Sequence, residues 1–219
     1  MAGLRERQKA DRLRRILDVA RERFRQEGYD KVTIDTIAAD AGVSAVTVYN
    51  YYGAKAGLLL ALVKESDDLL IAQLRILIGA PPADPREAVA QFAQTLRHHA
   101  LTYLTKPTWR QVLAASIVEG SADFGRTYMA LDRVLIAMMA DLVAAYQKLG
   151  VIPAAIQSGQ LGDTLFAIQN IRFFQFIAED DLADEAVDSL LRNDLAAIFA
   201  AEFTLADAPP RRRKIGQAQ

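Results

Sequence analysis

Apolar residues recur every three or four positions along most of the chain, which is the spacing of amphipathic helices. The first such segment runs from Lys9 to Glu27, with its apolar stripe at Leu13, Ile16, Leu17, Ala20 and Phe24. The period-two alternation of a β-strand is sustained nowhere. The pattern therefore predicts an all-α fold.

Capping residues and helix breakers divide the chain into further helices. Thr33 is a plausible N-cap for a second helix, Gly42 ends it, and Ser44 caps a third helix from Ala45 to about Tyr51. A fourth helix is expected over 55–78, before a proline-rich break at 79–85. The remaining helices are expected at 85–104, 107–120, 124–149, 159–178 and 184–205.

We interpret this organisation as two domains and a tail. Residues 1–55 form a three-helix helix-turn-helix DNA-binding domain, and the helix from about residue 55 links it to the body. Residues 56–207 form a second, larger helical domain. Residues 208–219 carry too little apolar character to pack, so we expect a mobile basic tail.

The third predicted helix is the candidate DNA reader. In a helix-turn-helix the exposed residues of the second helix of the motif meet base edges in the major groove. Ser44 and Asn50 could hydrogen-bond bases, whereas Ala45 and Val46 could contact thymine methyl groups. Three tyrosines close together cannot all point inward, so we expect Tyr49 to bind a phosphate and Tyr52 to pack inside.

Two further side chains are candidates for phosphate contacts. Lys55 begins a helix, where its charge opposes the helix dipole, an arrangement that makes sense if it shares a phosphate with the helix end. Thr33 could cap its helix and touch a phosphate as well.

Charge is distributed unevenly. The net charge of −1 combines about +3 over residues 1–55, −8 over residues 56–210 and +4 at Arg211–Lys214. A basic module beside an acidic body suits a partner that carries phosphates, although a solvated helix face would explain the basic run equally well.

Composition excludes several functional classes. The chain has no cysteine, its two histidines are adjacent, and 52% of its residues are hydrophobic. No apolar run is long enough to span a bilayer and no signal-peptide pattern is present, which indicates a cytoplasmic protein. Because no catalytic motif or metal-ligand cluster is found, we expect neither an enzyme nor a cofactor or metal site.

The motif region resembles the DNA-binding domain of the TetR (tetracycline-repressor) family of transcriptional regulators, over roughly residues 9–63. The matching positions are Thr33, Ile37-Ala38, Ala41-Gly42-Val43-Ser44, Thr47, Val48, Tyr49, Tyr52, Lys55, Leu58 and Leu59. The resemblance implies that Tyr49 and Lys55 bind phosphates and that positions 44–46 and 50–51, hence also Tyr51, face bases. Ala45, Val46, Asn50 and Ala54 depart from the usual family residues, which favours readout through methyl contacts and DNA shape.

The family also implies that the larger domain binds an effector and forms a homodimer. We expect polar groups among apolar helices to mark the pocket, with candidates His99, Tyr103, Trp109, Phe124, Tyr128, Phe166, Gln169 and Arg172. On such a helix, Gln169 and Arg172 are more often satisfied core or interface groups than ligand contacts. The two last helices are expected to form the dimer interface through Leu165, Phe173, Phe176, Leu191, Leu195, Ile198 and Phe199, with a monomer core as the alternative.

These observations lead to one functional hypothesis. The chain is expected to be a ligand-responsive regulator that binds double-stranded DNA, most simply a repressor released from a palindromic operator by a small hydrophobic or amphipathic effector. The alternative is a helical adaptor for protein partners in which the helix-turn-helix is vestigial.

Overall fold

The computed structural model describes residues 3–65, 67–118 and 123–206, and every element in these ranges is a helix. The helices are α1 (Leu4–Glu27), α2 (Ile34–Asp40), α3 (Ala45–Tyr52), α4 (Lys55–Glu65), α5 (Asp67–Gly79), α6 (Pro85–Tyr103), α7 (Lys106–Val118), α8 (Asp123–Lys148), α9 (Ser158–Ala178) and α10 (Asp184–Ala206). The all-α prediction is therefore confirmed. Within the described ranges, no helix combines the length and the apolar character needed to cross a bilayer.

Most predicted helix boundaries agree with the structure to within one or two residues. The exceptions are α1, which begins five residues before the expected Lys9, and the helix expected over 55–78, which is described as α4 and α5 with residue 66 between them outside the described ranges. The predicted tail at 208–219 also lies outside the described residues.

The predicted helix caps are present. The hydroxyl of Thr33 accepts a hydrogen bond from the Thr36 amide at 3.2 Å, and that of Ser44 accepts from the Thr47 amide at 3.2 Å. Each cap satisfies an amide that the helix itself leaves without a partner. Gly42, in the turn between α2 and α3, has a φ of +63°, as the sequence indicated.

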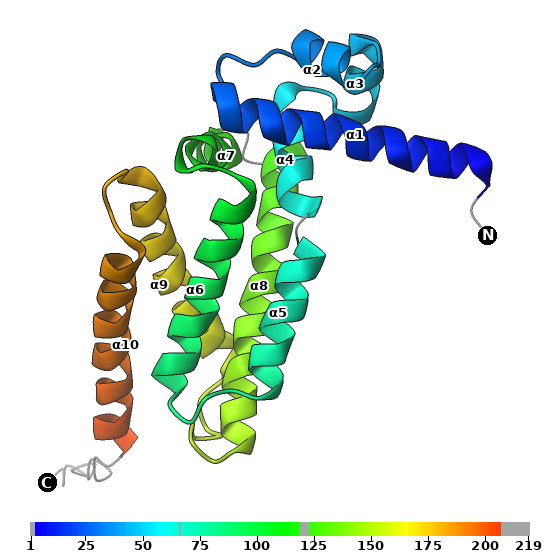
Figure 1. Ribbon diagram of the computed structural model, residues 1–219. Coiled ribbons are helices and arrows are strands. Elements are labelled where there is room, and N and C mark those ends of the chain that lie inside the picture. The colour runs from blue at the N-terminus through cyan, green and yellow to red at the C-terminus, as the bar shows by residue number, and fades with distance from the viewer. Residues whose placement is uncertain (1–2, 66, 119–122, 207–219) are drawn as a thin grey trace, which may run out of the picture.

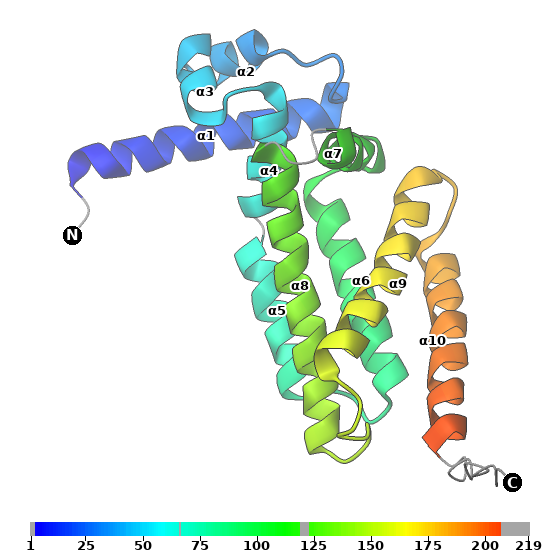
Figure 2. The ribbon, with the colours of Figure 1, turned by 180° about the vertical axis from the view of Figure 1, so that it is seen from behind.

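Figure 1 shows how the helices are arranged. α1 lies across the top of the molecule, with α2 and α3 above it, and α4 leads from this layer down into the body. α5, α6 and α8 run lengthwise through the body, α9 crosses them obliquely, and α10 stands at the outer edge. Seen from behind in Figure 2, the first turns of α1 extend beyond the rest of the molecule.

The hydrophobic core consists of two clusters. One begins in the helix-turn-helix with residues such as Ile16, Ile37 and Val48 and continues through α4 into α6, α7, α8 and the end of α9. The other fills the far part of the body between α5, α6, α8, α9 and α10. Because α4 contributes Leu58, Leu59, Leu62 and Val63 to the first cluster, the layer of α1, α2 and α3 shares one apolar core with the top of the body.

Two glycines allow backbones to approach closely. A Cβ added at Gly57 in α4 would lie 1.9 Å from the carbonyl oxygen of Tyr52 at the end of α3. A Cβ added at Gly162 in α9 would lie 2.6 Å from the Cα of Ala140 in α8. Gly57 therefore sets the distance between α3 and α4, and Gly162 sets that between α8 and α9.

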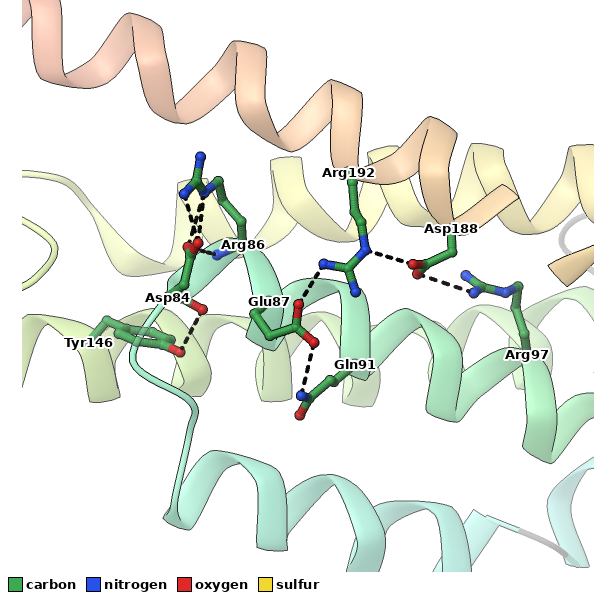
Figure 3. A network of polar contacts seen from close by, with 8 residues as sticks. All are labelled: Asp84, Arg86, Glu87, Gln91, Arg97, Tyr146, Asp188 and Arg192. Carbon is green, nitrogen blue, oxygen red and sulfur yellow. Dashed lines mark hydrogen bonds and ion pairs between the residues drawn. The ribbon is translucent and has the colours of Figure 1, made fainter. Parts of the chain in front are cut away.

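A polar network joins α10 to α6 (Figure 3). The guanidinium of Arg192 in α10 contacts Glu87 in α6 at 2.5 Å and Asp188 in its own helix at 2.7 Å. Arg97 of α6, only 2% exposed, pairs with Asp184 at 2.6 Å and faces Asp188 at 3.5 Å. Since a buried guanidinium is costly without a carboxylate partner, this network holds α10 in one register against α6.

Candidate DNA-reading surface and internal cavity

One face of α3 is presented to solvent. Val46 is 66% exposed and Tyr49 is 50% exposed, whereas Val48 between them is fully buried. Asn50 is also exposed and follows Val46 by one helical turn, so these three side chains share a face. An exposed valine and tyrosine on a short, well-anchored helix have no packing role, and their exposure is what a DNA-reading helix requires.

The other predicted DNA contacts are placed as follows. Ser44 and Thr33 are exposed at the starts of α3 and α2, where their hydroxyls serve as caps. Ala45 is half-buried against the core, so less of its methyl group is available than the sequence suggested. Tyr51 is half-buried with the Lys9 ammonium 5.8 Å from its ring centre.

Tyr52 is internal, as expected. Its hydroxyl donates to the Leu13 carbonyl of α1 at 3.3 Å, and burial raises the pKa of Tyr52 to about 12, assisted by the charge of Glu65.

Lys55 is bound within the chain, and its predicted phosphate contact stays a prediction. Its ammonium donates to the carbonyls of Tyr29 at 2.8 Å, Val32 at 3.0 Å and Asp30 at 3.5 Å. It also lies 4.2 Å from the centre of the Tyr29 ring. The physical reason is that the turn from α1 to α2 directs three carbonyls at the start of α4. In this structure the charge of Lys55 therefore binds this turn to α4.

The same arrangement occurs a second time in the body. Lys106, at the start of α7, donates to the carbonyls of Glu179 at 2.8 Å, Leu182 at 2.9 Å and Asp180 at 3.4 Å, with its ammonium 4.0 Å from the Phe176 ring centre. At both places, a lysine at the first position of a helix binds the carbonyls of a turn between two other helices: α1 and α2 for Lys55, and α9 and α10 for Lys106.

The arginines of α1 fall into two groups. Arg21, Arg23 and Arg25 form ion pairs, including Arg21 with Glu65 of α4 at 2.6 Å and Arg23 with Asp40 of α2. Towards the start of the helix, the basic side chains are exposed and no ion pair is formed by them within the described residues; they are Arg5, Arg7, Lys9, Arg12, Arg14 and Arg15. The first turns of α1, where this group begins, extend from the molecule (Figure 2).

A cavity of about 80 Å³ lies inside the body, below the helix-turn-helix. Its wall is mostly apolar and comes from α4, α5, α6, α7, α8 and α9. Five of the eight predicted pocket residues line it: His99, Trp109, Tyr128, Phe166 and Gln169. Trp109 is held in place because its indole N–H donates to the Ala100 carbonyl at 2.9 Å and its ring meets Phe173 edge-on.

Two polar groups of the cavity wall stand out. The side chain of Gln169 is 3% exposed, and its Oε1 accepts no hydrogen bond from any residue that the structure describes. Asp132 of α8 makes no ion pair or hydrogen bond with any described residue, and burial raises the pKa of its carboxyl group to about 6. Burial also raises the pKa of the neighbouring Tyr128 hydroxyl. Such groups are expensive in a protein interior unless a partner satisfies them.

Three predicted pocket residues lie elsewhere. Arg172 points to α10, where its guanidinium binds both oxygens of Asp194 at 2.6 and 2.7 Å. Tyr103 lies on the outer side of α6 against His99 and Arg21, in a surface hollow. Phe124 is buried in the first core cluster. Helical periodicity showed that these residues belong to inner helices but not which neighbour each one faces.

Sequence reasoning missed Asp132, whose acidic side chain resembles any other charge on a helix. It also missed Val63, Leu70, Leu96, Leu131, Leu135, Asn170 and Phe173 as lining residues. An acidic residue directly after an apolar helical position, within reach of Tyr128 one turn earlier, was the available signal.

The predicted dimer residues lie mostly inside the single chain. Six of the seven are buried inside the single chain: Leu165, Phe173, Phe176, Leu191, Leu195 and Phe199. Ile198 is half-buried against the second core cluster. They are buried because α10 packs on both α9 and α6, which covers the apolar stripes that seemed to need a partner chain. The outer faces of α9 and α10 instead expose Ile171 (52%) and Leu190 (39%).

Comparison with known proteins agrees with this architecture. Residues 16–62, which contain the exposed α3 face and its supporting helices, match the model of the bacterial regulatory proteins of the tetR family. The N-terminal region of the chain therefore resembles the tetR family of bacterial regulatory proteins. The HTH-type transcriptional regulator EthR of Mycolicibacterium smegmatis is 24% identical over 159 residues, covering 71% of this chain and 70% of EthR.

Solved structures of TetR proteins share the whole fold. The Thermus thermophilus repressor FadR, in complex with lauroyl-CoA, superposes with a TM-score of 0.68 at 22% identity, covering 85% of this chain and 93% of FadR. A TetR-family regulator from Pectobacterium atrosepticum gives a TM-score of 0.68 at 20% identity, covering 91% and 97%. At these identities the likeness concerns the fold.

Proposed function

We propose that this protein is a ligand-responsive DNA-binding regulator of the TetR type, in which α3 reads an operator and the internal cavity receives the effector. The observation that carries the proposal is the exposed face of α3, where Val46 and Tyr49 face solvent while Val48 anchors the helix. The unneutralised cations of α1 would add non-specific attraction to DNA phosphates.

The position of the cavity supports a response to ligand. Val63 of α4 lines the cavity. Leu62, its neighbour in the chain, and Leu59, one turn earlier, pack in the core cluster that includes the helix-turn-helix. A molecule that enlarges the cavity would displace α4 and therefore the reading layer, because interiors pack too densely to absorb the change. The effector would then favour a conformation with a different separation of reading helices, with a coupling free energy of about 1–3 kcal/mol.

Two α3 helices can bind a palindrome together only if two chains form a dimer. We infer that the outer faces of α9 and α10, with Ile171 and Leu190 exposed, form the contact between two chains. A two-fold dimer would present two α3 helices to half-sites about 35 Å apart on a palindrome. We propose repression as the outcome, with the effector releasing the operator.

The test is a mobility-shift assay on the DNA that flanks the gene. Val46→Glu places a negative charge on the reading face and should weaken binding by at least about tenfold through phosphate repulsion. The matched control is Val151→Glu, in the turn after α8 at the far end of the molecule, which should bind as wild type does. Equal binding by both variants would contradict the assignment of α3. Binding that does not weaken as salt is added would favour the adaptor alternative.

A further inference from the structure

The cavity wall carries an unusual chemical pattern. Of the ionisable side chains among its described lining residues, Asp132 is the only carboxylate, and neither lysine nor arginine is present. His99 and Tyr128 are the other titratable groups of the wall, contributed by α6 and α8. A ligand carboxylate or phosphate would therefore face Asp132 without a fixed positive charge to balance it.

Nothing in the fold requires a carboxylate at this place. The other buried or half-buried acidic groups have cationic partners: Asp184 pairs with Arg97, and Asp194 pairs with Arg172. Asp132 faces the cavity without such a partner in the part of the chain that the structure describes. A half-buried carboxylate without a cationic partner among the described residues indicates a partner from outside.

The remaining wall complements a cation. Four aromatic side chains surround the space: Trp109, Tyr128, Phe166 and Phe173. Aromatic faces attract organic ammonium groups most strongly where water is excluded, and a carboxylate beside them adds charge complementarity. The carbonyl oxygen Oε1 of Gln169, buried and without a partner among the described residues, is a further acceptor on the opposite helix.

An apolar extension is available for the body of such a ligand. A second void of about 40 Å³ lies between α5 and α8 and shares Leu70, Leu131 and Leu135 with the wall of the cavity. The present volume of about 80 Å³ admits only a small group, so a larger ligand must open the site.

From this geometry we propose that the effector is a hydrophobic organic cation, a substituted ammonium whose charge lies between Asp132 and the aromatic side chains while its apolar part extends toward α5. This rests on the proposed function, because it names the chemical class of the molecule to which the regulator responds.

The experiment uses three probes that share one alkyl chain: hexyltrimethylammonium, hexanoate and 1-hexanol. Binding to the full chain is followed by calorimetry and by fluorescence of Trp109, the single tryptophan of the sequence, which lines the cavity. We expect the cation to bind most tightly, and Asp132→Asn to weaken its binding by about tenfold or more while leaving hexanol unchanged. Asp141→Asn, an exposed acid on the same helix, is the matched control and should bind the cation as wild type does.

Three results would overturn the inference: preference for hexanoate, equal cation binding by the wild type and Asp132→Asn, or no binding of any probe. Operator binding measured with each probe separates this inference from the proposed function. If hexanoate alone releases the DNA, the regulator assignment stands and the cation assignment fails. If the cation binds through Asp132 without affecting the DNA complex, the ligand class stands and the response to it fails.

Discussion

At the scale of single residues, the carboxyl group of Asp132 is harder to ionise in the folded protein than in the unfolded chain. Its pKa is raised from 3.8 to about 6 by burial, so the folded protein holds this proton more tightly than the unfolded chain does. The cost of the ionised form is therefore complete above pH 6 and declines as the pH falls from 6 toward 4.

Asp132→Asn should for this reason raise the free energy of unfolding at pH 7.5 by about 1–3 kcal/mol, and by much less at pH 4.5. Urea unfolding at the two pH values measures the difference, with Asp141→Asn as the exposed control. A gain that is identical at both pH values would show that burial of the charge is not its cause.

The roles of Lys55 and Tyr49 can be distinguished by comparing stability with DNA affinity, since Lys55 is bonded within the fold and Tyr49 is exposed. Lys55→Met removes three hydrogen bonds to carbonyls and should lower the free energy of unfolding by about 1–3 kcal/mol. Tyr49→Phe removes an exposed hydroxyl, so thermal unfolding should not change while operator affinity in a mobility-shift assay falls several-fold. If Lys55→Met unfolds as wild type does and only DNA binding suffers, its role is at the phosphate backbone instead.

At the scale of elements, the spacing of helices depends on small residues. Gly162→Ala would bring a methyl group to 2.6 Å from the backbone of Ala140, so α8 and α9 must separate at their closest approach. We expect a loss of about 1–3 kcal/mol in the free energy of unfolding. Gly159→Ala, one turn earlier in α9 with no atom within 4 Å, should be neutral or stabilising by up to about 1 kcal/mol. Denaturant midpoints of the two variants compare these effects directly, and similar midpoints would refute a tight contact.

At the scale of the whole molecule, the proposed dimer depends on the surface that remains after α10 has packed on α6 and α9. Leu190→Glu places a charge on the outer face of α10 and should shift sedimentation at micromolar concentration from dimer to monomer. Leu149→Glu, at a more exposed site after α8, is the control and should leave the dimer intact. A dimer that survives Leu190→Glu, and also Ile171→Glu on α9, would mean that another face joins the two chains.

Local patterns in the sequence determined the elements of this protein and the region that reads DNA. Helical spacing, the caps at Thr33 and Ser44 and the glycine turn at Gly42 act through neighbours a few residues apart, so they can be recognised without a fold. The exposed and buried sides of α3 followed from the same short-range geometry.

Tertiary structure alone decided which partner each side chain meets. Lys55 binds carbonyls, Arg172 binds a carboxylate, and Leu195 is covered by other core residues. Each of these partners comes from a segment distant in sequence, or from a helix whose rotation the pattern leaves open. The isolation of Asp132 is of the same kind, because the lack of a countercharge is a property of six packed helices and not of any one of them.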